Sequence, residues 1–194
     1  FEDRDLKAKV TAETEAALGE EAIFGSNTST LPINGLAEAS NRPENFIGIH
    51  FFSPVQKMKL VEIIVGAQTS DRALAKAFDY ALAISKTPIV VNDSRGFYTS
   101  RVFSTYTNEG LALLGEGQHP QGIESAGRQA GMPVGPLALM DEVSLKLAYD
   151  IGKQTIADGD TGALHVESHP GFAVLRTMIE QEDRKGRAYG GGFY

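Results

Sequence analysis

The stretch from Asn45 to Gly66, NFIGIHFFSPVQKMKLVEIIVG, most constrains what this chain can fold into. It predicts two short apolar strands joined by a polar turn, with His50 closing the first strand and Glu62 inside the second. A charge buried in a strand is costly unless it is paired, and His50 is the partner within reach of a hairpin. A carboxylate bonded to one imidazole nitrogen fixes the tautomer and leaves the other nitrogen free as a base. The stretch therefore predicts a catalytic dyad of His50 and Glu62.

Each of these two residues also has a purely structural interpretation. A histidine beside aromatic residues is often a satisfied core or rim residue. A glutamate in an apolar strand can face solvent, because successive side chains point to opposite faces. The pattern alone leaves these alternatives open.

The composition limits the classes of partner. The chain has 194 residues and is 42% apolar, enough to bury the core of one large domain or two small ones. A net charge of −7 and a pI near 5.1 disfavour a nucleic-acid surface and favour a metabolite as partner. With no cysteine, the chain has neither disulfides nor thiolate metal sites, which suits a reducing cytoplasm. No apolar run approaches the roughly 20 residues that span a bilayer, so we expect no membrane insertion and no targeting signal.

Strand and helix patterns alternate over the first half of the chain. A helix predicted over residues 1–18 ends at Gly19 as C-cap, and four of its residues share one face: Leu6, Val10, Thr14 and Ala17. Ser70 is the expected N-cap of a later helix. The further predicted elements are strands at 22–25, 46–51, 60–65 and 87–91 and helices at 31–40 and 70–85. This alternation predicts a doubly wound, Rossmann-like α/β sheet.

From Gly96 onward the sequence predicts helices and no convincing strand. The expected helices cover 97–114, 120–130, 136–157 and 171–182, followed by a loop over 183–194. A domain boundary is therefore predicted near 92–96. It divides the chain into an α/β part, 1–94, and an all-helical part, 95–194.

A nucleotide-binding α/β half normally opens with a strand and the turn G-x-G-x-x-G, which holds the pyrophosphate. The sequence has no such turn after a strand, and Gly190, Gly191 and Gly192 lie at the wrong end. We expect the chain to begin within a nucleotide-binding domain, to bind a dinucleotide poorly and to be inactive alone.

Five sequence blocks together resemble the 3-hydroxyacyl-CoA dehydrogenases. They are SNTS at 26–29, GIHFFSPV at 48–55, MKLVEII at 58–64, KTPIVVND at 86–93 and GMPVGPLALMD at 131–141. The likeness covers essentially the whole chain and is closest to the dehydrogenase part of bacterial multifunctional fatty-acid oxidation proteins. It implies that 1–94 is the C-terminal part of an NAD-binding domain and 95–194 the helical C-terminal domain.

The resemblance also implies roles for individual residues. His50 matches the family's general acid or base, and Glu62 matches the glutamate that orients and charges it. Ser29 matches a serine that contacts both cofactor and substrate. Three further residues are assigned by resemblance to cofactor binding: Glu2, Lys7 and Asn27. Taken alone, Ser29 is an ordinary turn serine, and Glu2 and Lys7 belong to a solvated helix face.

The chain departs from the family pattern at two positions. Ser100 stands where relatives carry an asparagine near the substrate carbonyl, and a hydroxyl lacks the planar pair of functions of an amide. Three alternatives follow for the role of that asparagine: Ser100 takes it over as a catalytic residue, a water molecule takes it over, or the role is lost. Arg95 replaces a hinge proline and adds a cation, to which we assign no role beyond a conceivable contact with a CoA phosphate.

Other charged or metal-ligating residues carry weaker hypotheses. His165 and His169 are spaced to share a helix face, but Pro170 follows and no carboxylate triad is evident, so no metal site is expected. Lys57 and Lys59 are candidates for CoA phosphates or simply solvated. Asp141 has no evident catalytic task, and residues 131–136 are expected to form a structural turn into a helix.

By resemblance, the expected reaction is NAD-dependent interconversion of 3-hydroxyacyl-CoA and 3-oxoacyl-CoA in fatty-acid β-oxidation. One alternative is a non-catalytic fragment whose helical part mediates subunit contacts. Another is a dehydrogenase of a small free 3-hydroxy acid, which the proton relay alone does not distinguish. Apolar faces on helices 97–114 and 136–157 fit a homodimer or packing against other domains of a longer polypeptide.

Overall fold

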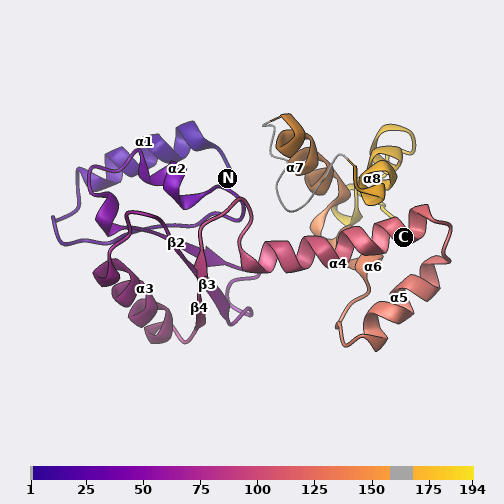
Figure 1. The fold of residues 1–194 in the computed structure, drawn as a ribbon, viewed down its shortest axis with the longest axis horizontal. Helices are drawn as coiled ribbons and strands as arrows, with labels where there is room; N and C mark the ends of the chain where they lie inside the picture. The colour runs from indigo at the N-terminus through magenta and orange to yellow at the C-terminus, as the bar shows by residue number, and fades with distance from the viewer. Residues whose placement is uncertain (1, 158–167) are drawn as a thin grey trace. The chain divides into compact units, whose positions relative to one another are not determined.

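The computed structural model of the chain describes residues 2–157 and 168–194, which form two compact units, 1–100 and 101–194. The first unit contains a sheet with helices on both faces (Figure 1). Its elements are α1 (Arg4–Glu15), β1 (Phe24–Ser26), α2 (Ile33–Ala37), the 3₁₀ turn η1 (Pro43–Asn45), β2 (Phe46–Phe51), β3 (Leu60–Val65), α3 (Asp71–Ala83) and β4 (Thr87–Asn92). Within the described ranges, no helix combines the length and apolarity needed to cross a membrane.

The four strands form one mixed sheet in the order β1-β2-β3-β4. The pairs β1–β2 and β3–β4 are parallel, because α2 and α3 provide the crossovers, while the loop 52–59 returns the chain to make β2–β3 antiparallel. The strands 46–51 and 60–65 match the predicted ranges, and the predicted Rossmann-like α/β class is confirmed.

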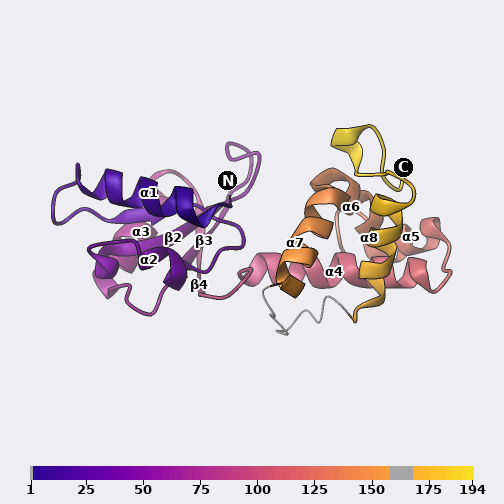
Figure 2. The ribbon, with the colours of Figure 1, turned by 90° about the horizontal axis from the view of Figure 1, so that it is seen from above.

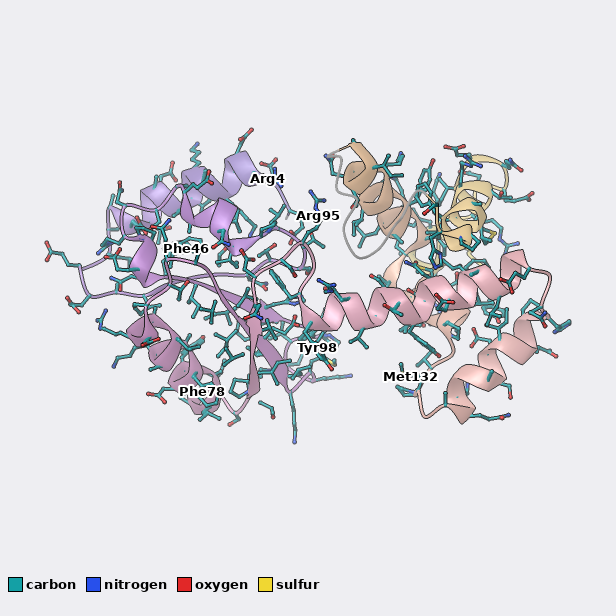
Figure 3. The ribbon with its side chains drawn as sticks, in the orientation of Figure 1. Arg4, Phe46, Phe78, Arg95, Tyr98 and Met132 are labelled. Atoms are coloured by element: carbon teal, nitrogen blue, oxygen red, sulfur yellow. The ribbon has the colours of Figure 1, made fainter. Side chains whose placement is uncertain are left out.

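The alternation of side chains along β2 and β3 divides the core of the first unit into two layers. One face packs against α2 through Phe46, Ile64 and Ile33, and Phe97 closes this layer. The opposite face packs against α3 through a second group: Ile47, Val61, Ile63, Ala77 and Ala81. Figure 2 shows α1 and α2 over the strands, and Figure 3 labels Phe46 within this unit. Because His50 and Glu62 share the even-numbered face, they point toward the α2 layer.

The buried face of α1 differs from the predicted one. Leu6 and Val10 are 42% and 40% exposed, whereas Thr11 and Glu15 are buried. The Glu15 carboxylate accepts hydrogen bonds from the Ser40 hydroxyl and the Asn41 amide, so polar anchoring sets the orientation of this helix. The helix also ends at Glu15 with Ala16 as C-cap, which corrects the predicted end at Gly19.

The helix α3 has the predicted N-cap and a well-defined C-terminus. The Ser70 hydroxyl accepts a hydrogen bond from the Ala73 amide. At the other end, the Ser85 amide donates to Leu82 O and the Lys86 amide to Ala81 O, which is the Schellman pattern. This pattern places Ser85 at a φ of 59°, a conformation that favours glycine.

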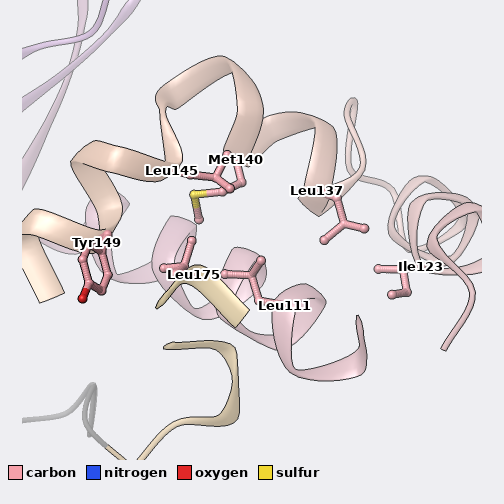
Figure 4. Close-up of a cluster of buried hydrophobic side chains, with 7 residues drawn as sticks. All are labelled: Leu111, Ile123, Leu137, Met140, Leu145, Tyr149 and Leu175. Carbon is pink, nitrogen blue, oxygen red and sulfur yellow. The ribbon is translucent and has the colours of Figure 1, made fainter. Parts of the chain in front are cut away.

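The second unit is helical around one apolar cluster. Helix α4 (Tyr98–Gly115) begins in the first unit and continues through the second, and the remaining elements are α5 (Pro120–Gln129), α6 (Pro136–Val143), α7 (Leu145–Ala157), α8 (Pro170–Glu180) and η2 (Arg187–Tyr189). Figure 4 shows the buried cluster, which comprises Leu111, Ile123, Leu137, Met140, Leu145, Tyr149 and Leu175.

Two predictions for the second unit are wrong in detail. The helix predicted over 136–157 is two helices, because Ser144 adopts a φ of 105° and its hydroxyl accepts from the Leu147 amide at the start of α7. The tail predicted to be loop contains η2 and a bridge between Gly186 and Gly191. Asp141 holds the chain end by accepting from the amides of Phe193 and Tyr194.

The turn 131–136 is structural, as predicted, and depends on a buried carboxylate. Glu124 Oε1 accepts hydrogen bonds from the amides of Leu137 and Ala138, each at 2.9 Å, and so caps the start of α6. Gly135 lies so close that an added Cβ would meet Glu124 Oε2 at 1.8 Å and its Cα at 2.9 Å. Only a residue without a side chain fits beside this cap.

We predict that Ser85→Gly stabilises the chain. Glycine removes the steric cost of the left-handed conformation, which outweighs its greater entropy in the unfolded chain, for a net gain of about 0.5 to 1 kcal/mol. Urea unfolding measures this gain. Ser85→Ala is the matched control, because it removes the hydroxyl and keeps the strain. Equal stability of the glycine and alanine variants would contradict the prediction.

We predict that Gly135→Ala destabilises the second unit by about 2 kcal/mol or more, because the methyl group displaces the Glu124 cap and crowds its backbone. Gly122→Ala is the control, since nothing lies within 4 Å of its added Cβ on α5. That variant should be neutral or slightly stabilising in thermal unfolding. A Gly135→Ala variant as stable as the parent would show that the cap is dispensable.

Candidate functional site

The site is built on the antiparallel pairing of β2 and β3. His50 and Glu62 are direct partners in this register, and His50 Nδ1 lies 2.7 Å from Glu62 Oε2. Both side chains are buried, with Glu62 0% exposed. The pairing predicted from the two apolar runs is therefore present, and the solvent-facing alternative for Glu62 is wrong.

Three hydrogen bonds stabilise the buried Glu62 carboxylate as an anion. Besides the bond to His50, Thr99 donates from its amide to Oε1 and from its hydroxyl to Oε2, both at 2.8 Å. Burial raises the pKa of Glu62, but the hydrogen bonds from His50 and Thr99 outweigh it and hold this pKa below the usual value. An ionised Glu62 accepts a hydrogen bond from Nδ1–H, which fixes the His50 tautomer.

Ser29 lies at the other end of the imidazole. Its Oγ is 3.1 Å from His50 Nε2, the nitrogen that Glu62 leaves unprotonated in the neutral tautomer. The Ser29 hydroxyl therefore donates to Nε2. Ser29, His50 and Glu62 form a continuous chain of hydrogen bonds, which we call the relay.

The N-terminal segment holds the turn that carries Ser29. Glu2 accepts from the Thr28 hydroxyl, the Ser29 amide and the Thr30 hydroxyl, while Lys7 Nζ donates to Asn27 O at 2.7 Å. Burial raises the pKa of Glu2, yet these three hydrogen bonds and the nearby Lys7 lower it overall. Glu2 and Lys7, predicted by resemblance to line a cofactor, thus also fix the geometry of this turn.

Asp93 and Asn27 provide two further anchors for the same region. Asp93, which follows β4, accepts from the amides of Ile33 and Asn34 at 2.8 Å each and so fixes the start of α2. Asn27 Oδ1 accepts from the Phe51 amide and ties the end of β1 to the end of β2. The carboxyl ends of these two parallel strands therefore meet at Ser29 and His50.

Aromatic rings flank the imidazole. Phe52 lies 4.4 Å and Phe97 6.0 Å from the His50 ring, measured between centroids. Lys86 holds the loop after Phe52 by donating to the carbonyls of Val55 and Met58. The rings limit how far the imidazole can turn and shield its bond to Glu62 from water.

A pocket of about 510 Å³ lies on the α3 face of the sheet, opposite to His50 and Glu62; it is lined by Gly25, Asn27, Ile49 and Phe51 from β1, β2 and the turn after β1, and by Lys76 and Tyr80 from α3. Asn27 stands on the same turn as Ser29, and the Lys7 ammonium reaches the carbonyl of Asn27 from α1. These donors and acceptors are chemically suited to the ribose and carboxamide of a nicotinamide nucleotide.

The two departures from the family pattern lie beside the site. The Ser100 hydroxyl donates to the Ser29 carbonyl at 3.3 Å, which braces the serine turn from α4. Arg95 is half-buried in the segment between β4 and α4, and it is labelled in Figure 3.

The structure describes three of the four residues for which the sequence carried weaker hypotheses of metal or phosphate binding. His169 caps α8 by accepting from the Gly171 amide, while its proposed companion His165 lies outside the described residues. Among residues 2–157 and 168–194, no cluster of three metal-ligating side chains occurs. Lys57 and Lys59 are exposed on the loop 52–59.

Sequence reasoning missed Thr99 and Asp93. Both act on partners far along the chain, Thr99 on Glu62 and Asp93 on the start of α2, so no local periodicity reveals them. A hydroxyl residue directly after the apolar pair Phe97 and Tyr98 was the available signal for Thr99.

The relay also has the order of groups found in serine hydrolases, so its chemistry has to be distinguished from nucleophilic catalysis. A hydrolase uses amides next to its nucleophile to stabilise an oxyanion. Here the Ser29 amide donates to the Glu2 carboxylate, whose charge would oppose an oxyanion. The arrangement instead suits transfer of a proton between a bound hydroxyl group and His50 Nε2.

Comparisons with known proteins agree with this geometry. Residues 1–94 match the family profile described as 3-hydroxyacyl-CoA dehydrogenase, NAD binding domain, and residues 96–194 match the C-terminal domain of the same enzymes. The fatty acid oxidation complex subunit alpha of Shewanella putrefaciens is 44% identical over all 194 residues of this chain, which span 26% of that relative's length.

Solved structures also match over the whole chain. The (S)-3-hydroxybutyryl-CoA dehydrogenase PaaH1 of Ralstonia eutropha has a TM-score of 0.89 at 34% identity, and this chain covers 67% of it. FadB2 of Mycobacterium tuberculosis has a TM-score of 0.87 at 27% identity, again with 67% covered.

We predict that Glu62→Gln lowers stability in a pH-dependent manner. Because the folded pKa of Glu62 lies below its reference value of 4.5, its stabilisation is complete above that pH and is lost as the pH falls through the folded pKa. The variant should lose about 1 to 3 kcal/mol at pH 7, and the gap should narrow toward pH 3. Urea unfolding at both pH values measures it, with exposed Glu13→Gln as control. A gap that is constant with pH would contradict the prediction.

Proposed function

Because the chain belongs to the 3-hydroxyacyl-CoA dehydrogenase family, we propose that it supplies the proton-transfer machinery for NAD-dependent oxidation of 3-hydroxyacyl-CoA to 3-oxoacyl-CoA. The observation that carries this proposal is the relay itself. His50 is bonded through Nδ1 to a buried, ionised Glu62 and presents Nε2 to Ser29. A base of this kind is what oxidation of a secondary alcohol requires.

In the proposed reaction, His50 Nε2 accepts the proton of the substrate's 3-hydroxyl group. Glu62 stabilises the resulting imidazolium without taking its proton, as a fixed carboxylate does in other histidine pairs. The Ser29 hydroxyl orients the reacting oxygen, since it can both donate and accept at this position. In the reverse direction, the imidazolium returns the proton to the carbonyl oxygen of the 3-oxoacyl group.

Bound NAD supplies the hydride acceptor for this oxidation. Residues 1–94, which match the family's NAD-binding domain, would hold it, and we propose that Lys7 and Asn27 contact it beside Ser29. Glu2 keeps the Ser29 turn in place while this occurs. Ser100 is proposed to act on the turn through the Ser29 carbonyl, in place of the asparagine expected near the substrate.

The substrate class rests on the relatives. Their names refer to fatty acid oxidation and to 3-hydroxybutyryl-CoA, which supports a CoA thioester over a small free 3-hydroxy acid. The relay acts on the hydroxyl group alone and would serve either substrate. A direct comparison of the two substrates therefore decides between them.

We further propose that 1–94 and 95–194 act as parts of a longer β-oxidation polypeptide of the cytoplasm. Some apolar side chains on two of the helices are exposed: Val102 and Leu113 on α4, and Leu147 and Ile151 on α7. We propose that these faces pack against a second copy or against other domains of such a polypeptide. Analytical ultracentrifugation would test the first of these arrangements.

We predict that His50→Ala lowers dehydrogenase activity at least about 100-fold in either direction, because it removes the group that takes the proton in oxidation and returns it in reduction. The assay follows NADH consumption with acetoacetyl-CoA, on this chain and on a form extended upstream through a Gly-rich turn. We expect activity in the extended form alone, and much weaker turnover of free acetoacetate.

His119→Asn is the matched control for this substitution. It removes a histidine from the start of α5 but keeps a side chain that can accept from the Gln121 amide. Its activity should equal that of the parent. Full activity of the extended His50→Ala variant would contradict the proposed function, and activity of the unextended chain would contradict the expected need for the turn.

A further inference from the structure

The first turn of α4 contacts both partners of His50. Thr99 donates two hydrogen bonds to Glu62, which lies on the Nδ1 side of the imidazole. The next residue, Ser100, donates to the carbonyl of Ser29, which lies on the Nε2 side. Two consecutive hydroxyl residues thus brace the two ends of the relay.

We propose that Thr99 is a positioning residue of the dehydrogenation reaction, which it serves by fixing the Glu62 carboxylate against His50. This inference rests on the proposed function, because it assigns a role within the same relay. Thr99 does not touch the imidazole, so it acts through Glu62.

The geometry explains why two bonds from one residue have this effect. The Thr99 amide holds Oε1 and its hydroxyl holds Oε2, so that the plane of the carboxylate cannot rotate about its last side-chain bond. Oε2 is also the atom bonded to His50 Nδ1. Fixing this plane keeps that bond short and aligned, as proton transfer at Nε2 requires.

The position of Thr99 in α4 strengthens its hold on the anion. Thr99 is the second residue of an 18-residue helix, where backbone amides lack partners within the helix. The positive end of the helix favours a negative charge at this point. The hydrogen bonds from Thr99 are also among the causes that lower the pKa of Glu62.

Among the residues that contact Glu62 directly from β2, β4 and α4, His50 is the titratable one. His50 faces it from β2, β4 places Ile89 at the neighbouring register position, and α4 contributes Thr99. Glu2 stands behind Ser29 at the far end of the relay. The pH dependence of the contact therefore reports on Glu62 and His50 together.

The test uses Thr99→Val, which keeps the size and the amide but removes the hydroxyl. In the form extended upstream through the Gly-rich turn, we expect this variant to lower kcat for acetoacetyl-CoA reduction about tenfold. Its KM should stay within about twofold of the parent value. Thr99→Ser should restore most of the activity, because it returns the donor. Thr107→Val is the matched control on the same helix, since its hydroxyl bonds to carbonyls of α4.

A second measurement, on the 194-residue chain itself, needs no cofactor. Thr99→Val should lower the thermal midpoint at pH 7, and this difference should shrink toward pH 3, because Glu62 becomes protonated as the pH falls through its folded pKa and then needs the donor less. Thr107→Val should lower the midpoint equally at both pH values. Equal differences for Thr99→Val at the two pH values would overturn the proposal.

The outcomes separate the positioning role from the proposed function. Unchanged kcat in Thr99→Val, together with inactive His50→Ala, overturns the positioning role and leaves the function standing. Full activity of His50→Ala overturns the function and, with it, the positioning role of Thr99 in that reaction. A fall in kcat that Thr99→Ser rescues supports both.

Discussion

The buried carboxylate of Glu62 is the interaction on which the first unit depends. An ion inside a sheet is stable only when its hydrogen-bonding capacity is filled. Here β2 supplies His50 and the first turn of α4 supplies Thr99, so elements from distant parts of the chain are drawn to one strand position. The same requirement that stabilises the anion places a polarised imidazole at the edge of the sheet.

A second set of polar contacts turns this edge into a site. The Ser29 turn is held by Glu2 from the N-terminal segment and by Ser100 from α4, while Asp93 fixes the helix that follows the turn. Each contact is made by a group outside the turn or helix that it supports. The geometry at His50 is therefore a property of the whole first unit. Family membership and the relay both support the proposed oxidoreductase reaction.

Features set by short-range sequence patterns were predictable, whereas features set by contacts between residues far apart in the chain were not. The strands at 46–51 and 60–65 were predictable because apolar runs end at polar turns, and Glu62 within such a run required a partner such as His50. The face of α1 was not predictable, because Glu15 is buried by partners that no helical period reveals. Likewise, the break at Ser144 depends on a backbone conformation seldom adopted by serine, and Thr99 acts across 37 residues.

The contact between Gly135 and Glu124 has a consequence for how such sequences can diverge. A side chain at 135 would collide with the Glu124 carboxylate, and loss of that carboxylate would leave two helix amides unpaired. Neither position can change first without loss. Substitution at this pair therefore has to pass through a less stable intermediate, so the two positions should be inherited together.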